Sequence, residues 1–257
     1  MYSDFKVIDR ELDASFPYID IYPLFDLHVG APNFNNAVFQ RWKKEVLHNP
    51  YGFVGYGGDL MNNGLKNSKT NTYAETMRPH EQKEFLYEEL KPLRSRVLWG
   101  HRGNHEARNE DLADNDPIYD LFCRWGIEER YRQNACFVAV RLGSRKKCPS
   151  QKTTYGIVST HGVSKNKHDR WVQAIDGADV FFAGHTHKSS EEEPGKLRFN
   201  LQRKSVSAVP YENIVVSSFL KYGDYALRGE YLPNAVGGFQ KVRLYGDRKH
   251  VGYARGL

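Results

Sequence analysis

The sequence predicts an α/β (α+β) protein in which layered β-sheets are covered by helices. Short runs rich in β-branched and aromatic residues alternate with amphipathic stretches, which is the pattern of strands followed by covering helices. Hydrophobic residues make up 40% and charged residues 26% of the 257 residues. This composition is typical of a globular protein and excludes a collagen-like, coiled-coil or wholly disordered chain.

The first half of the chain alternates expected strands and helices. Strands are expected over residues 19–25, 51–56 and 95–99. Helices are expected over residues 36–48, 81–90 and 116–125. Apolar residues recur at helical spacing in the first helix, Pro92 ends the second, and Pro117 begins the third. The polar stretch 62–78 is expected to be a loop that either shapes a substrate pocket or only connects two elements.

The second half is richer in expected strands. They cover residues 136–142, 154–160 and 180–183, with one helix over 168–175. Residues 189–196 are expected to form a loop, and 197–256 to be strand-like with turns at 221–223 and 237–238. No composition shift marks a boundary, so the sequence predicts a single domain over 1–257.

Charge and cysteine content restrict the class of protein. Three cysteines without CxxC spacing indicate reduced thiols, and no basic flank precedes an apolar run at the N-terminus, so a cytoplasmic location is expected. No stretch reaches the ~18 apolar residues of a membrane helix. The net charge of +6 suits a nucleic-acid partner and equally a solvated basic surface. The oligomeric state is left open.

Polar residues with metal-binding side chains follow one expected strand after another. They are Asp26-x-His28, Gly58-Asp59, Gly103-Asn104-His105, His161 and Gly184-His185-x-His187. Open α/β sheets carry their functional groups on loops at the carboxyl ends of strands. Carboxylate, imidazole and amide ligands suit Mn, Fe, Zn, Co or Ni, and the absence of thiolates argues against a closed structural zinc site. Two ions need more ligands than one, and a carboxylate can bridge them.

This ordered series resembles the calcineurin-like metallophosphoesterase superfamily. The motifs span residues 26–187. The chain is most similar to phage-encoded and bacterial members that carry a GDLxNN motif, which residues 58–63 reproduce here. The resemblance implies a four-layer αββα sandwich of two mixed sheets flanked by helices. The strands over 197–256 would complete those sheets.

The resemblance also implies a role for each motif residue. A first metal would be held by Asp26, His28 and His187, and a second by Asn104, His161 and His185. Asp59 would bridge the two divalent ions, with manganese expected first. His105 would be the general acid at the leaving-group oxygen, and Glu106 would orient its ring.

The function expected from this resemblance is hydrolysis of phosphodiester bonds, in nucleic acids or nucleotides, by a metal-activated hydroxide. One alternative is a phosphomonoesterase acting on nucleotides or proteins, and another is a non-catalytic nucleic-acid-binding or scaffold protein. Residues 102–106 reproduce the RGNHE motif of protein phosphatases of this superfamily. The arginine of their GDxVDRG motif is missing from residues 58–64, which weakens the protein phosphatase alternative.

Four basic stretches form either a nucleic-acid groove or a solvated surface. They cover residues 66–69, 145–147, 165–167 and 196–204. Lys165 and Lys167 follow His161 closely, so they are expected to face the site if any of the four does.

Overall fold

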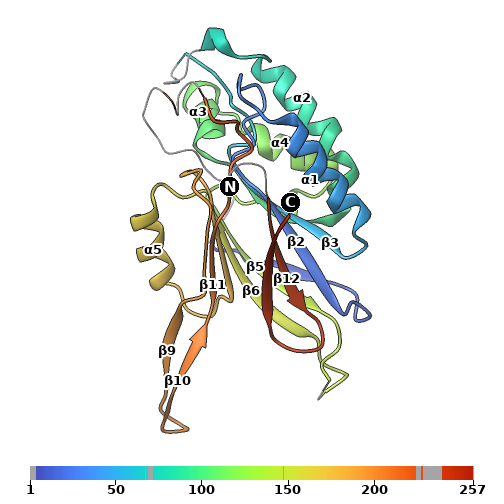
Figure 1. Cartoon of the computed structure of the whole chain (residues 1–257), viewed down its shortest axis with the longest axis vertical. Helices are drawn as coiled ribbons and strands as arrows, with labels where there is room; N and C mark the ends of the chain where they lie inside the picture. Colours follow the sequence, from blue (N-terminus) through green and yellow to red (C-terminus); the bar gives the residue numbers. More distant parts are fainter. Residues whose placement is uncertain are drawn as a thin grey trace.

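The computed structural model describes residues 4–66, 68, 72–146, 148–223, 227 and 239–256. Two large mixed sheets face each other, and helices cover their outer surfaces (Figure 1). The first sheet has the strand order β13 (Val251–Gly256), β12 (Phe239–Tyr245), β2 (Tyr18–Leu24), β3 (Gly52–Gly57) and β4 (Val97–His101). The second has the order β1 (Ile8–Glu11), β5 (Ala135–Leu142), β6 (Thr153–Thr160), β7 (Val180–Ala183), β11 (Glu212–Val215) and β8 (Ser190–Glu192).

Helices complete the outer layers. The first sheet packs against α1 (Asn36–His48), α2 (Pro79–Leu90) and α4 (Pro117–Trp125). The second packs against α5 (Lys165–Gln173). Helix α3 (Asn104–Ala113) follows β4, and short 3-10 turns cover Thr72–Ala74, Lys91–Arg96 and Glu128–Arg130. The predicted four-layer αββα arrangement is therefore confirmed.

Large apolar side chains from both sheets form the layer between them. Trp99 from β4 and Phe182 from β7 are fully buried, with ring centroids 5.5 Å apart. Gly55 on the neighbouring strand β3 leaves room for the indole, because a Cβ there would lie 2.1 Å from the Trp99 ring. The inter-sheet packing thus fixes how the two sets of strand ends meet.

Most expected elements are present with small shifts at their ends. Helix α1 and strand β7 have the predicted bounds, whereas α5 begins three residues earlier than expected. The prediction of a loop over 189–196 is wrong, because β8 lies within it and β9 (Gly195–Asn200) begins there. Strand β8 is short and polar, so its sequence lacks the apolar alternation that predicts a strand. It forms because its backbone pairs with β11. The turn predicted at 237–238 lies outside the described residues.

Strand β1 and helix α3 were also not predicted. In the described part of the chain, no helix combines the length and apolar character that crossing a membrane requires.

Truncating the central indole tests the inter-sheet packing. Trp99→Ala is expected to lower the free energy of unfolding by about 3–5 kcal/mol, because it removes a buried side chain and leaves a cavity. Urea denaturation of the two proteins measures the difference. Tyr253→Ala, at a side chain that is 47% exposed, is the control and should cost much less. Equal losses in both variants would contradict the assigned core.

Candidate metal centre

The candidate ligands stand on loops at the carboxyl ends of strands from both sheets. Asp26, Asp59 and Asn104 follow β2, β3 and β4 of the first sheet. His161 and His185 follow β6 and β7 of the second. Because β2, β3 and β4 are parallel, as are β6 and β7, each set of loops gathers at one edge of its sheet. The two edges meet, and the predicted ligands converge there.

One group of donors comes from the loops after β2 and β7. The Nε2 atoms of His28 and His187 lie 3.2 Å apart. They lie 3.8 and 3.3 Å, respectively, from Oδ1 of Asp26. These three residues form the predicted first metal set, and their donor atoms lie within 4.8 Å of one another.

A second group gathers around Asn104. Its Oδ1 atom lies 3.1 Å from Nε2 of His161 and 2.8 Å from Nδ1 of His185. Oδ2 of Asp59 lies 3.1 Å from Nε2 of His161 and 3.9 Å from Nε2 of His28. Asp59 therefore stands between the two groups, as a bridging carboxylate would.

The backbone holds many of these residues in an uncommon conformation. Five of the seven predicted ligands have positive φ: Asp26 (48°), His28 (51°), Asp59 (50°), His185 (67°) and His187 (56°). Left-handed backbone at a non-glycine residue costs roughly 1–3 kcal/mol and persists only where the surrounding structure enforces it. Such a concentration of strain in one place indicates that these loops are built for a functional site.

The hydrogen bonds of these residues fix their outer atoms and leave their inward-facing atoms in position to bind a metal ion. Oδ2 of Asp26 accepts a hydrogen bond from the His185 N–H, whereas its buried Oδ1 has no hydrogen-bond partner. Oδ1 of Asp59 accepts from the His105 N–H, which leaves Oδ2 directed at the imidazoles. In His161 the Nδ1–H donates to the Gly57 carbonyl, which leaves Nε2 directed at the other candidate ligands. Outer hydrogen bonds of this kind orient metal ligands.

The charges of the cluster are strongly coupled. Burial lowers the pKa of His161, but the Asp59 and Asp26 carboxylates outweigh burial and raise that pKa to about 10. Burial raises the pKa of Asp59, but His161 and His105 outweigh it and hold that pKa well below its usual range. Protons on the histidines and divalent cations therefore compete to neutralise the same buried carboxylates.

His105 lies beside the cluster at the start of α3. Its Nε2 atom is 3.8 Å from Oδ2 of Asp59. Its Nδ1 atom is 2.6 Å from the Asn62 carbonyl, which can only accept, so Nδ1 carries the proton. Burial lowers the pKa of the His105 imidazole. The ring is thus fixed with Nε2 toward the candidate centre.

Glu106 differs from its expected role as the group that orients His105. Its buried carboxylate accepts hydrogen bonds from the backbone N–H groups of Asp59 (2.9 Å), Met61 (2.9 Å) and Gly103 (2.8 Å). Burial, followed by the Asp59 charge, raises the pKa of Glu106 to about 7. Consecutive helical residues do not face each other, which explains why the Asn62 carbonyl holds the His105 ring instead. Glu106 ties the loop after β3 to the start of α3.

Arg108 was missed by the sequence reasoning. It lies three residues after His105 on α3, and its Nη1 atom is 3.1 Å from Oγ of Ser68 and 3.4 Å from the Asn62 carbonyl. The spacing i, i+3 on one helix face is the signal that would have found it. The hydrogen bond from the Gly103 N–H to Glu106 also has a sequence signal, because Gly103-x-x-Glu106 has the spacing of a capping box at the start of a helix.

Lys165 does not serve as expected. Its ammonium group pairs with Glu192 at 2.7 Å and with Asp169 at 3.7 Å, so its charge is used between α5 and β8 rather than at the centre. Lys69 and Lys147, from two other predicted basic stretches, lie outside the described residues.

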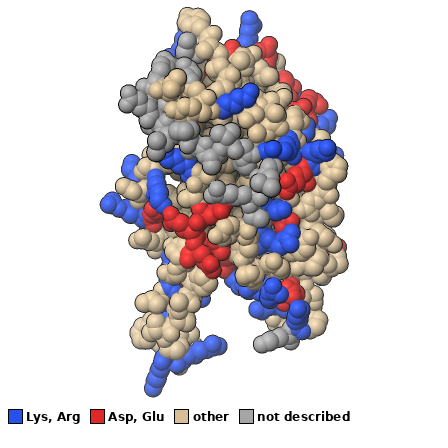
Figure 2. All heavy atoms as spheres, in the orientation of Figure 1, with Lys and Arg blue, Asp and Glu red and all other residues tan. Residues whose placement is uncertain are grey.

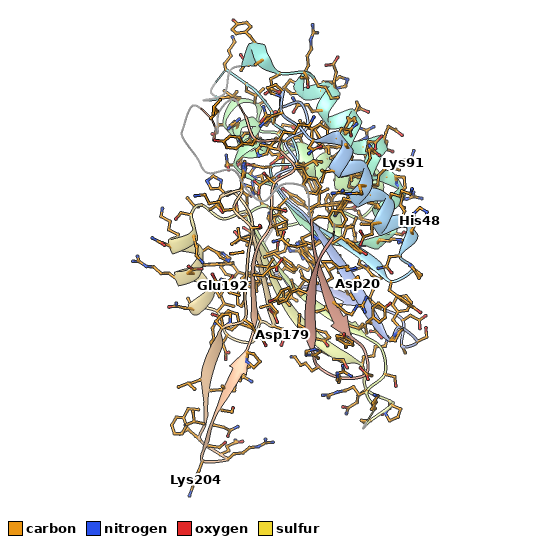
Figure 3. All side chains as sticks on the ribbon, in the orientation of Figure 1. Asp20, His48, Lys91, Asp179, Glu192 and Lys204 are labelled. Atoms are coloured by element: carbon orange, nitrogen blue, oxygen red, sulfur yellow. The ribbon has the colours of Figure 1, made fainter. Side chains whose placement is uncertain are left out.

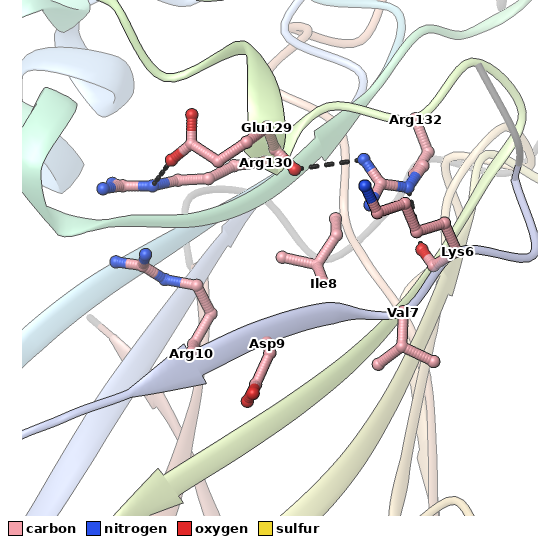
Figure 4. A pocket seen from close by; sticks show the side chains of 8 residues that line it. All are labelled: Lys6, Val7, Ile8, Asp9, Arg10, Glu129, Arg130 and Arg132. Carbon is pink, nitrogen blue, oxygen red and sulfur yellow. Dashed lines mark hydrogen bonds and ion pairs between the residues drawn. The ribbon is translucent and has the colours of Figure 1, made fainter.

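A separate cavity of about 230 Å³ lies beside β1 (Figure 4). It is lined by Lys6, Val7, Ile8, Asp9, Arg10, Glu129, Arg130 and Arg132. None of the predicted metal or catalytic residues lines it, so it is not part of the candidate centre.

Comparisons with known proteins find similarity among solved structures. No family model and no curated protein matches the sequence. A predicted phosphoesterase from Streptococcus pneumoniae is 13% identical, with 93% of this chain and 90% of that chain covered and a TM-score of 0.39. Zinc-complexed Vps29 from Entamoeba histolytica is 12% identical (93% and 98% covered, TM-score 0.42). A metallophosphoesterase from Sphaerobacter thermophilus is 11% identical (93% and 89%, TM-score 0.42). Similarity this distant does not transfer an activity, so the candidate centre stands on its own geometry.

Removing the charge of the shared carboxylate tests the bridging position. Asp59→Asn is expected to weaken binding of both Mn²⁺ equivalents together, each by at least about tenfold, because the residue stands between both ligand groups. Isothermal titration calorimetry of the two proteins gives the stoichiometry and affinities. Asp111→Asn, on the exposed part of α3, is the control. Loss of one equivalent alone would show that Asp59 serves a single ion.

The outer carboxylate is tested separately. Glu106→Gln replaces one acceptor oxygen by an amide nitrogen that cannot accept, so either the Met61 N–H or the Asp59 and Gly103 N–H groups lose their partner. We expect about a 10–100-fold loss of Mn²⁺ affinity, since Asp59 is no longer held in place. The same titration measures it, with the exposed Glu128→Gln as control. An unchanged affinity would mean that the β3 loop keeps its position without Glu106.

Proposed function

We propose that the chain is a metal-dependent phosphoester hydrolase of the calcineurin-like metallophosphoesterase type that cleaves phosphodiester bonds. The observation that carries the proposal is the convergence of two ligand groups on Asp59, with the imidazole of His105 directed at the same point. Divalent ions held there supply Lewis-acid stabilisation of the charge that develops on a phosphoryl group. Neither ligand group includes a thiolate, which suits an open catalytic site.

The ligand assignment follows the two groups described above. Asp26, His28 and His187 would hold one ion, and Asn104, His161 and His185 the other, with Asp59 shared. Manganese is the ion we expect first, because mixed imidazole, carboxylate and amide donors suit it; iron, zinc, cobalt and nickel also fit.

His105 is proposed as the general acid. With Nδ1–H held by the Asn62 carbonyl, its Nε2 atom is the position that can deliver a proton to a departing oxygen. Burial lowers the pKa of the imidazole, so the protonated ring gives up its proton readily. General acid catalysis of this kind contributes about 10²–10⁴-fold to a rate.

Arg108 is proposed to supply positive charge for the substrate phosphate. The arginine of the protein phosphatase motif is missing from residues 58–64, and Arg108 reaches the same loop from α3. Its guanidinium is half-buried and within electrostatic range of Asp59 and Glu106. A guanidinium suits recognition of a phosphate anion.

Hydrolysis of two nitrophenyl esters tests the proposed function. Bis-p-nitrophenyl phosphate and p-nitrophenyl phosphate are compared with Mn²⁺ added and after chelation. Metal-dependent turnover of the diester supports the proposal, and DNA, RNA and cyclic nucleotides then identify the substrate. Turnover of the monoester alone would make the protein a phosphomonoesterase. No turnover of either ester with bound metal would indicate a non-catalytic protein.

His105→Ala separates metal binding from catalysis. The variant is expected to keep its Mn²⁺ content, because His105 is not needed by either ligand group, but to lose about 10²–10⁴-fold in kcat. The loss should be smallest for nitrophenolate, a good leaving group that needs little protonation. Steady-state kinetics with nitrophenyl and alkyl esters measure the difference. A loss that is the same for all leaving groups would contradict the general-acid role.

A further inference from the structure

The hairpin of β9 (Gly195–Asn200) and β10 (Ser205–Pro210) extends away from the body of the molecule (Figure 1). It forms a two-stranded sheet of its own. The next strand, β11, begins beside the start of β7, and β7 runs toward the candidate centre. The hairpin therefore lies at the opposite end of the sheet from the metal ligands, and its role is independent of the proposed function.

One face of the hairpin is apolar and exposed. Phe199 pairs with Val206, and Leu197 with Ala208, so these four side chains share one face. Leu197, Phe199 and Val206 are 80%, 66% and 61% exposed. A two-stranded hairpin is marginally stable in water unless its apolar face packs against something. An exposed apolar face of this kind marks an interaction surface.

The other face is already held by the body. Lys196 donates hydrogen bonds to the carbonyls of Val172 and Ile175 at the end of α5. Arg198 pairs with Asp176 at 3.4 Å. These contacts fix the direction of the hairpin and turn its apolar face outward.

Charge changes sign along the hairpin. Glu191, Glu192 and Glu193 lie where it leaves the body, and Arg203 and Lys204 form its tip. Figure 2 shows acidic surface at the base, uncharged surface along the hairpin and basic groups at the far end, and Figure 3 labels Glu192 and Lys204 at these two places. The surface is thus acidic, then apolar, then basic.

We infer that this surface binds a second copy of the same chain, with the two hairpins packed face to face and antiparallel. A two-fold axis through the middle of the apolar face makes the surface complementary to itself. Each basic tip then meets the acidic base of the other copy, while Phe199 and Val206 pack against Leu197 and Ala208 of the other copy. A strand of six residues spans roughly 20 Å, so the two hairpins overlap along their whole length in this arrangement.

The association is tested first on the apolar face. Sedimentation velocity of the full chain over the micromolar range is expected to show a concentration-dependent species of twice the mass of the 29.7 kDa chain. Phe199→Glu should raise the dimer dissociation constant at least about tenfold, because it places a carboxylate in the centre of the interface. Leu112→Glu, at an exposed apolar residue outside the hairpin, should change nothing.

The antiparallel arrangement is tested by exchanging charges. A tip variant, R203E/K204E, and a base variant, E193K, should each dimerise more weakly than the wild type, since the attraction between tip and base is then lost. Glu193 is exchanged rather than Glu192 because Glu192 already pairs with Lys165. Mixed in equal amounts, the two variants should form a heterodimer more tightly than either variant associates with itself, because the basic tip of the base variant then meets the acidic base of the tip variant.

Three outcomes would overturn the inference. A wild-type chain that stays monomeric would show that the hairpin does not bind a second copy and point to a different macromolecule as its partner. A dimer that Phe199→Glu leaves intact would place the interface elsewhere. Mixed charge variants that associate no better than either variant alone would exclude the antiparallel arrangement.

Discussion

Two carboxylates, Asp26 and Asp59, lie buried where the edges of the two sheets meet, with 0% and 2% of their surfaces exposed. A buried carboxylate is stable only beside positive charge or hydrogen-bond donors. Here each has one oxygen fixed by a backbone N–H and one directed at imidazoles. The carboxylates raise the pKa values of His161 and His187, so these imidazoles can carry compensating positive charge despite burial. Divalent ions would replace those protons, so the same constraint explains the stability of the cluster and would favour the metal binding that we propose.

The two sheets stabilise these buried carboxylates by holding the strained loops that carry them close together at the ends of rigid strands. The Glu106 carboxylate accepts hydrogen bonds from the N–H of Asp59, after β3, and from the N–H of Gly103, after β4. It therefore links the carboxyl ends of these two strands. Gly103 permits the close approach, because a Cβ there would lie 2.2 Å from Oδ1 of Asp59. Side chains held this way would need little reorganisation to bind an ion, and the strain of their backbone is offset by packing elsewhere.

Local sequence signals predicted most elements and the residues that converge at the candidate centre, but not the contacts between distant segments. Helix α1 has strong apolar periodicity, and the metal-ligand residue types after each strand indicated one shared site. Strand β8 and the role of Glu106 depend on contacts with residues far along the chain, which a linear pattern does not contain. The expected role of Glu106 failed because neighbours on a helix point in different directions. The exposed apolar face of the hairpin could be recognised only from the register of β9 and β10. Apolar alternation in the sequence does not reveal whether such a face is covered by other parts of the chain.

Crystals grown with Mn²⁺ would show whether one carboxylate, Asp59, joins two metal sites. Anomalous scattering should show two peaks on either side of Asp59, one beside Asp26, His28 and His187 and the other beside Asn104, His161 and His185. Two ions at that place are what a two-metal phosphoesterase requires. A single peak, or none among these residues, would mean that Asp59 does not join two metal sites.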